Sequence, residues 1–491
     1  MKVVLINPPG GYYAARWEES ALPSLGLGYL AAFLEKYGVG CEILDAHALQ
    51  MKMPDIQRHL KESRPDIIGF TFATENRFFG FDAIRAARSA VPSAFIVAGG
   101  PHVSAASEDT LKHIHELDAV VRGEGEMALL QLTRSIESGD GPNSVPNVSY
   151  RVDGGVAVNP PGDFIQDLDS LPFPARHLMP MDRYRYTADV PGVGKLKALN
   201  IMASRGCPFD CSFCASPGMW GRKYRARSPE NMLAEVDELV NRYEAKALWV
   251  FDDTFTVQRS RTEAICEGMM ERFPGIKWFC EIRVDTVDRE LLALMQKAGC
   301  YCVAFGVESG SQRIIDESIG KRIKVEQVRQ VVGWCRELKL QYNPFMILSH
   351  PGETEEDARQ TMAMIREWHT DKSPVSLAIM HIYPGTRIEK IAFEKGILPH
   401  DFSWASKEDA KRVPMLPAAQ GDVPIFLDKL SWEFLSGCLF EWAELQRYSI
   451  WKRIPKALLS IRSLSDAKRY WGMLKAYMAR QNVGKHSKGK A

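Results

Sequence analysis

The first 140 or so residues alternate short apolar runs with stretches in which apolar residues recur at helical spacing. The apolar runs, interpreted as strands, cover residues 3–6, 41–44, 67–71, 95–98 and 119–121. The helix-like stretches lie near residues 25–37, 81–91 and 127–137. Strand and helix in alternation predict βαβ units and a parallel sheet that is covered on both faces. We therefore predict an α/β protein that begins with a doubly wound, Rossmann-like domain over residues 1–140.

A second alternation of the same kind starts near residue 199. Its strand candidates cover residues 200–203, 248–251, 278–282, 302–307, 343–348 and 377–381. Its helix candidates cover residues 229–242, 263–272, 289–297, 325–337 and 355–368. This succession predicts a partial (β/α)6 barrel over residues 195–400. In such barrels the active-site residues are expected at the carboxyl ends of the strands.

Between the two alternations, residues 141–194 are predicted to be a linker. Turn residues cluster at 138–142. Residues 147–150 and 156–159 flank Asp153-Gly154, a dipeptide that predicts a hairpin.

The pattern changes again from about residue 401. Trp432, Leu435, Leu439 and Trp442 recur at helical spacing, with further aromatic residues around them. We predict a small, mostly helical C-terminal region over residues 401–491, in which these side chains form the core of a cap. A wall of the substrate pocket and peripheral contact with a lipid surface are the alternatives, and we do not favour the membrane contact.

Composition and charge narrow the class of protein. The 491 residues are 45% hydrophobic and 25% charged, and the net charge of +1 argues against nucleic acid as a partner. The apolar run at residues 3–6 stops at Asn7-Pro8-Pro9, which is too short for the core of a signal peptide. The sequence contains no run of about eighteen apolar residues, so it predicts no transmembrane helix. Ten cysteines without a secretory signal favour a reducing compartment, so we expect a cytoplasmic protein.

The ends of the predicted strands in the first domain carry polar residues and glycines. In parallel α/β sheets, ligands bind beyond the carboxyl ends of the strands, and glycine lets the backbone approach a ligand closely. The candidate ligand-binding residues at these ends are Asn7, Pro8, Thr71, Gly99, Gly100, His102, Gly123 and Glu124.

Three cysteines, Cys207, Cys211 and Cys214, follow the first predicted strand of the barrel. Thiolates this close in sequence can converge on one metal centre. A structural zinc site needs four closed ligands, and no fourth Cys or His lies nearby; a disulfide is disfavoured in a reducing compartment. Three cysteines suit a [4Fe–4S] cluster in which one iron stays open for another ligand.

Basic and aromatic residues follow the cysteines, and they include Arg222, Lys223, Tyr224, Arg225 and Arg227. They could position an anionic substrate or face solvent. We expect most of them at the surface.

The spacing C-x3-C-x2-C, with Phe213 before the last cysteine, closely resembles the radical SAM superfamily. The resemblance covers about residues 195–385. It implies that Cys207, Cys211 and Cys214 hold a catalytic [4Fe–4S] cluster whose open iron binds S-adenosylmethionine (SAM). One electron then splits a carbon–sulfur bond, and the 5′-deoxyadenosyl radical abstracts a hydrogen atom from the substrate.

The same resemblance implies roles for residues at the ends of later strands. Asp252 and Asp253 correspond to the segment that meets the SAM amino group, although a helix N-cap is an equal alternative for both. Glu281 and Arg283 correspond to the region that holds the SAM ribose and carboxylate, and Glu308 lies in a turn similar to the adenosyl-binding turn. The sequence departs from the family at His350, where a glycine is usual.

Residues 1–140 resemble the cobalamin-binding domain that precedes the barrel in many radical SAM enzymes. The resemblance rests on Asn7-Pro8-Pro9, residues 23–30, Gly99-Gly100-Pro101-His102 and Gly123-Glu124-Gly125-Glu126. The cobalt-ligating motif Asp-x-His-x-x-Gly is absent after the first strand, and Asp45-Ala46-His47 lacks its glycine.

This departure shapes the cofactor site that we expect. If cobalamin binds, its own base is expected to be displaced, with no histidine on cobalt. We expect His102 to line the cofactor pocket, while Tyr12 and Tyr13 could cover a corrin face.

These resemblances imply a cobalamin-dependent radical SAM enzyme with a [4Fe–4S] cluster, SAM and cobalamin as cofactors. The main hypothesis is methylation of an unactivated carbon in a small-molecule, lipid or peptide substrate, by way of the 5′-deoxyadenosyl radical and methylcobalamin. The first alternative is cyclisation or oxidative rearrangement of the magnesium-protoporphyrin cyclase type. The second is a non-catalytic cobalamin or iron–sulfur sensor. The expected protein partner is an electron donor such as flavodoxin or ferredoxin.

Overall fold

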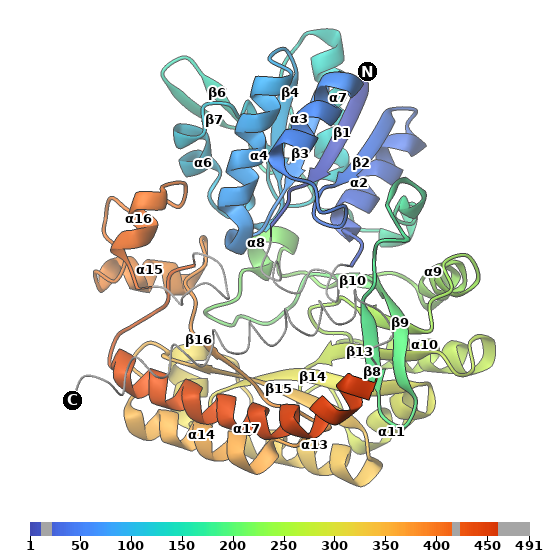
Figure 1. Cartoon of the computed structure of the whole chain (residues 1–491), viewed down its shortest axis with the longest axis vertical. Helices are drawn as coiled ribbons and strands as arrows, with labels where there is room; N and C mark the ends of the chain where they lie inside the picture. The colour runs from blue at the N-terminus through green and yellow to red at the C-terminus, as the bar shows by residue number, and fades with distance from the viewer. Residues whose placement is uncertain (11–21, 415–422, 460–491) are drawn as a thin grey trace.

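The computed structural model describes residues 1–10, 22–414 and 423–459, with side chains described up to residue 446. Two sheets organise it, one in the N-terminal part and one in the middle of the chain (Figure 1). The expectations for Tyr12 and Tyr13 lie outside the described residues. So do the side chains of Tyr448 and Trp451, two of the aromatic residues near Trp442 in the predicted C-terminal region.

The first sheet contains seven strands in the order β2-β1-β3-β4-β5-β6-β7. Five of them are parallel: β1 (Lys2–Asn7), β2 (Gly40–Asp45), β3 (Ile67–Thr71), β4 (Phe95–Gly99) and β5 (Ala119–Val121). The predicted hairpin extends this sheet: β6 (Val148–Val152) pairs antiparallel with β5, and β7 (Gly155–Val158) pairs antiparallel with β6. We call β1–β7 and the helices between them the N-terminal domain.

Both faces of the first sheet are buried, as the near-continuous apolar strands predict. Successive side chains of a strand point to opposite faces. Val3 and Leu5 therefore pack with α2 (Leu25–Lys36) and α7 (Glu126–Ser138). Val4 and Ile6 pack with α3 (Met53–Ser63) and α4 (Arg77–Ala90) on the other face. The remaining helices of this domain are η1 (Thr74–Asn76), α5 (Pro101–Ala105) and α6 (Ser107–His113).

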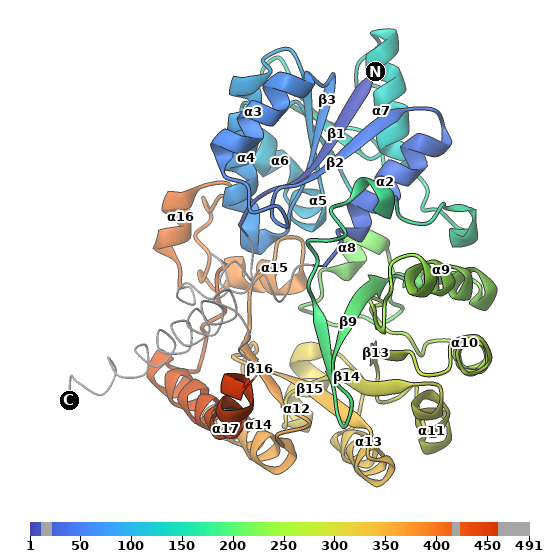
Figure 2. The same ribbon diagram turned by 45° about the vertical axis from the view of Figure 1, so that its right-hand side comes forward.

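The second sheet has the order β16-β15-β14-β13-β12-β9-β8, and it curls into an open half-barrel with helices outside (Figure 2). The six predicted strands are parallel, and they are β9 (Gly194–Ile201), β12 (Ala247–Val250), β13 (Lys277–Ile282), β14 (Cys300–Glu308), β15 (Gln341–Leu348) and β16 (Ser376–Ile379). The sequence did not predict β8 (Thr187–Val190), which pairs antiparallel with β9 at one edge. The outer helices are α9 (Pro229–Asn241), α10 (Arg259–Arg272), α11 (Arg289–Lys297), α12 (Gln312–Ile314), α13 (Val325–Leu338) and α14 (Glu355–Trp368).

The C-terminal region does not form the separate cap that we expected. α17 (Trp432–Leu459) packs against α14 and β16 of the barrel. Leu435 is fully buried there, and the indole N–H of Trp442 donates to the carbonyl oxygen of Val375 at 2.8 Å. The helix therefore completes the core of the barrel, because its apolar side chains find partners there.

The segment before α17 joins the barrel to the N-terminal domain. It contains α15 (Arg387–Glu394) and α16 (Lys407–Arg412). The buried guanidinium group of Arg77 donates to the carbonyl oxygen of Trp404 at 2.8 Å, and Lys407 pairs with Asp82 at 3.2 Å. Among the helices of the described ranges, none is both long and apolar enough to cross a membrane.

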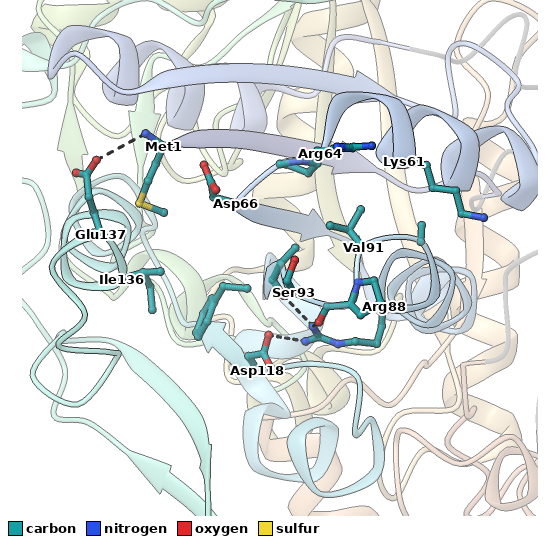
Figure 3. A pocket seen from close by; sticks show the side chains of 15 residues that line it. Met1, Lys61, Arg64, Asp66, Arg88, Val91, Ser93, Asp118, Ile136 and Glu137 are labelled. Carbon is teal, nitrogen blue, oxygen red and sulfur yellow. Dashed lines mark hydrogen bonds and ion pairs between the residues drawn. The ribbon is translucent and has the colours of Figure 1, made fainter.

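A cavity of about 940 Å³ lies at the amino ends of the strands in the first sheet (Figure 3). Its wall includes Met1, Arg88, Asp118 and Glu137, and the ion pair between Arg88 and Asp118 measures 2.6 Å. Ligands of parallel sheets bind at the opposite edge. We therefore assign no cofactor to this cavity despite its size.

The docking of α17 can be tested by truncating Leu435. Leu435→Ala should lower the free energy of unfolding by about 2–5 kcal/mol, because a fully buried leucine leaves a cavity. Phe440→Ala on the same helix is the control, since Phe440 is 39% exposed. Urea denaturation followed by circular dichroism measures both variants. Equal losses for the two variants would show that α17 is not packed as described.

Candidate active site

The three cysteines lie in a loop that a short antiparallel strand pair closes. β10 (Ser204–Arg205) pairs with β11 (Arg225–Ala226), and we call residues 206–224 between them the cysteine loop. Gly206 opens the loop with a φ of +84°, and a Cβ atom there would lie 2.5 Å from the carbonyl oxygen of Lys223. The two ends of the loop meet backbone to backbone at this point, which only glycine permits.

Further contacts tie the cysteine loop to the carboxyl ends of the barrel strands. Ser212 donates its backbone N–H to the carbonyl oxygen of Ile319 at 3.0 Å, in the π-helix η4 (Ile315–Ile319) after β14. The guanidinium carbon of Arg283 lies 3.5 Å from the ring centroid of Phe209. The loop is thus held from several strands at once.

The three thiols are half-buried and close enough to influence one another. Burial raises the pKa of the Cys211 thiol, and burial raises that of Cys214 to about 12, with neighbouring loop cysteines adding to both shifts. The Sγ atom of Cys207 lies 3.8 Å from the Thr254 hydroxyl oxygen. Metal binding would therefore release protons from these thiols.

The arrangement of the thiols discriminates between kinds of metal centre. A structural zinc site needs four closed ligands, and the cysteine loop supplies three thiols. A cubane cluster is larger, and each thiolate binds a different iron. Three thiols on one anchored loop therefore fit the cluster better than zinc.

Two of the predicted acidic residues are available to a ligand beside the loop. The side chain of Glu281, near the end of β13, makes no hydrogen bond within the part of the chain that the structure describes. Burial raises its pKa to about 7, and the charges of Asp253 and Glu308 add to the rise, while Lys321 opposes it. Asp253 accepts a hydrogen bond from the Ser216 hydroxyl at 2.5 Å, and burial raises the pKa of its carboxyl.

Asp252 is instead used by the protein itself, which corrects the expectation of a cofactor contact or an N-cap. It is 2% exposed. Its Oδ1 accepts the backbone N–H groups of Ala203 and Ser204 at 2.7 and 3.0 Å, and its Oδ2 accepts the Ser204 hydroxyl at 2.6 Å. Asp252 thus fixes the segment that leads into the cysteine loop.

Arg283 and Glu308 are also engaged by protein groups. Arg283 donates to both carboxylate oxygens of Asp285, at 2.9 and 2.8 Å. Glu308 has a φ of +70°, and its Oε1 accepts from the Lys321 ammonium group at 2.7 Å. Both side chains are thus bound to protein groups, which leaves fewer of their polar atoms for a ligand.

A second candidate site lies at the carboxyl ends of the strands in the first sheet. A cavity of about 300 Å³ there is lined by Asn7, Thr71, Phe72, Ala73, Glu75, Asn76 and Pro101. Gly100 borders it with a φ of +96°, and a Cβ atom there would lie 2.7 Å from the Thr71 hydroxyl oxygen. The predicted residues Asn7, Thr71 and Gly100 are therefore brought together. Pro8 directly follows β1, and Gly99 is the last residue of β4.

His102 does not line this cavity, contrary to the prediction. Its ring is fully buried among Phe72, Phe81 and Trp404, and its Nδ1 lies 3.1 Å from the Thr74 hydroxyl oxygen. Burial, together with the nearby Arg77 charge, holds its pKa well below the usual range. The imidazole is therefore neutral and structural, because its partners come from distant segments that pack over it.

The Gly123-Glu124-Gly125-Glu126 segment joins the N-terminal domain to the cysteine loop. Glu124 accepts hydrogen bonds from Arg205 at 3.1 Å and from Arg225 at 2.6 Å, and Glu126 accepts from Arg205 at 2.5 Å. A Cβ atom on Gly123 would lie 3.4 Å from the carbonyl oxygen of Met219 in α8 (Ser216–Trp220). Glu124, predicted to bind a cofactor, is thus an interdomain ion-pair residue.

Sequence reasoning also missed the burial of the arginines that follow the cysteines. Arg225 and Arg227 are buried, whereas we expected most of these residues at the surface. Arg227 pairs with Glu235, which also accepts from Arg176 at 2.6 Å. The acidic partners of these arginines lie in other segments of the chain. The clustering of arginines near the cysteines was therefore the only signal in the sequence for buried ion pairs.

The chain matches two known protein families. Residues 201–365 match the radical SAM superfamily, and residues 19–133 match the B12 binding domain. The chain is 33% identical over 399 residues to an uncharacterised methyltransferase of Pyrococcus horikoshii, covering 81% of this chain and 84% of the relative. It is 28% identical over 412 residues to an anaerobic magnesium-protoporphyrin IX monomethyl ester cyclase of Rubrivivax gelatinosus, covering 80% and 72%.

A solved structure of TsrM, a radical SAM methyltransferase from Kitasatospora setae with cobalamin and a [4Fe–4S] cluster bound, shares the fold. Its TM-score is 0.70 at 17% identity, over 90% of this chain and 88% of that chain. The two family matches fall on the two sheets of the structure. The chain belongs to the radical SAM enzymes that carry a B12-binding domain, with a [4Fe–4S] cluster, SAM and cobalamin as cofactors.

Proposed function

We propose that this enzyme transfers a methyl group to an unactivated carbon of a small-molecule, lipid or peptide substrate. The observation that carries the proposal is the contact between its two cofactor regions. Helix α5 begins at Pro101, which lines the cavity of about 300 Å³ in the N-terminal domain. It contacts α8, which begins two residues after Cys214. A substrate between the two regions would face both.

The residues of the chain divide into those that would hold each cofactor and those that hold the loop. We propose that Cys207, Cys211 and Cys214 ligate the cluster, and that Asp253 and Glu281 contact SAM beside it. Asn7, Thr71 and the backbone at Gly100 would hold cobalamin. When bound, the cluster and SAM supply a hydrogen-abstracting radical, and cobalamin supplies a transferable methyl group.

Neither of the two histidines that the sequence singled out in the N-terminal domain lines the cavity of about 300 Å³, which fits methyl transfer. His102 is fully buried in an aromatic cluster, and His47 is not among the residues that line the cavity of about 300 Å³. Cobalamin in that cavity would be held by Asn7, Thr71 and the backbone at Gly100, and it would supply a transferable methyl group. The name of the relative with 33% identity, a methyltransferase, supports the same proposal.

Cyclisation is the second candidate function, since a cyclase is 28% identical to the chain over most of its length. Anaerobic turnover with dithionite and SAM distinguishes the two reactions. Methyl transfer consumes SAM in two ways, so 5′-deoxyadenosine and S-adenosylhomocysteine should form in equal amounts in the presence of substrate. Quantitative chromatography of both products measures the ratio. Deoxyadenosine without S-adenosylhomocysteine would exclude methyl transfer.

The carboxyl of Glu281 predicts a pH-dependent affinity for SAM. Because its pKa is raised to about 7, it is mostly ionised at about pH 8 and mostly protonated at about pH 6. The ionised form accepts hydrogen bonds from ribose hydroxyls and favours a cationic ligand. The dissociation constant of SAM should therefore rise as the pH falls through 7.

Glu281→Gln provides the control for this pH dependence. The variant should bind SAM more weakly at about pH 8 and lose the change between about pH 8 and about pH 6. Anaerobic equilibrium dialysis with the reconstituted protein measures both. A variant with the same pH profile as the wild type would assign the titration to another group.

A further inference from the structure

The closing strands of the cysteine loop place two arginines directly opposite each other. Arg205 on β10 pairs with Arg225 on β11, and their side chains are 3% and 2% exposed. Like charges that face each other across a strand pair destabilise the pairing, and burial makes an unpaired charge costlier still. The loop therefore cannot close in this way unless negative charge is supplied nearby.

The negative charge comes from the N-terminal domain. The Oε1 atom of Glu124 accepts from both arginines, at 3.1 Å from Arg205 and 2.6 Å from Arg225, while Glu126 accepts from Arg205 at 2.5 Å. The two carboxylates are 4% and 5% exposed. Two arginines and two glutamates thus form a neutral, buried cluster that exists only while the two domains are docked.

Arg205 also contacts both ends of the cysteine loop. It lies two residues before Cys207 in sequence. Its guanidinium carbon lies 5.0 Å from the ring centroid of Trp220, in the helix that follows Cys214, and 5.2 Å from that of Tyr29 in the N-terminal domain. A shift of Arg205 would therefore move the backbone on both sides of the three thiols.

We propose that Glu124 and Glu126 are positioning residues for the iron–sulfur cluster, supplied by the B12-binding domain to close the cysteine loop of the barrel. Docking of the N-terminal domain thereby sets the geometry of the cluster ligands. Partners that orient metal ligands typically change metal affinity by roughly 10–100-fold. The inference rests on the cysteines as cluster ligands and not on methyl transfer, so it stands whichever reaction the enzyme performs.

The test compares the rate of cluster loss in the full-length, anaerobically reconstituted wild type, Glu126→Gln and Asp118→Asn. Asp118 belongs to the same domain but pairs with Arg88 at 2.6 Å, at the opposite edge of the sheet. Each variant neutralises one ion-paired carboxylate with an isosteric amide. The decay of cluster absorbance after addition of an iron chelator gives the rate, and thermal denaturation gives the stability.

Glu126→Gln should release its cluster roughly tenfold faster than the wild type, whereas Asp118→Asn should release it at the wild-type rate. The electron paramagnetic resonance spectrum of the reduced cluster should change in Glu126→Gln and stay unchanged in Asp118→Asn. Arg205→Lys should behave like Glu126→Gln, because lysine keeps the charge but lacks the planar fork that bridges two carboxylates. Cluster release at the wild-type rate in Glu126→Gln would overturn the proposal. Equal acceleration in Asp118→Asn would also overturn it.

A second variant keeps the test decisive if Glu126→Gln fails to fold. Trp220→Leu removes the ring over Arg205 and leaves all four charged residues in place, and Trp220 is only partly buried. It should accelerate cluster release without an equal loss of thermal stability. An unchanged rate in this variant would contradict the role of Arg205 as the link between the two ends of the loop.

Discussion

Two buried arginines that face each other across β10 and β11 constrain the whole molecule. They close the loop that carries the three cysteines, and the carboxylates that neutralise them belong to the other domain. Breaking a buried ion pair by removing one partner costs about 3–5 kcal/mol, since the remaining charge stays buried without compensation. The position of the cysteine loop therefore depends on the docking of the two domains.

This constraint explains why many polar side chains near the thiols do not face a ligand. Asp252 holds the strand that enters the cysteine loop, and Arg283 stacks on Phe209 within it. Glu281 and Asp253 are left beside the thiols, with pKa values raised by burial. A radical enzyme needs residues that hold its site in place as well as residues that contact the ligand, because a reactive intermediate must be shielded.

Except for β8, the strands of both sheets could be predicted from the sequence, because they are short apolar runs followed by turn residues. The cysteine motif could be recognised as readily, since its three cysteines lie within one loop. The contacts of Glu126 and Arg205 were not, because these residues are separated by 79 positions and meet only when two domains dock. His102 was misassigned for a related reason: Trp404, which packs on its ring, comes from the far end of the chain.

The same reasoning accounts for the C-terminal region. Its helical period was visible, but whether Leu435 and Trp442 formed a core of their own or joined another depended on the barrel edge. The open side of β16 and α14 supplies that surface. Periodicity predicts the element, and the tertiary partner decides its role.

A cluster held by the thiolates of Cys207, Cys211 and Cys214 would leave one iron open to SAM. Mössbauer spectroscopy of protein reconstituted anaerobically with iron-57, recorded without and with SAM, tests this arrangement. SAM should change the isomer shift of a single iron site and leave the others unaltered. A cluster whose iron sites all remain equivalent after SAM is added, or a protein that binds zinc in place of iron, would contradict it.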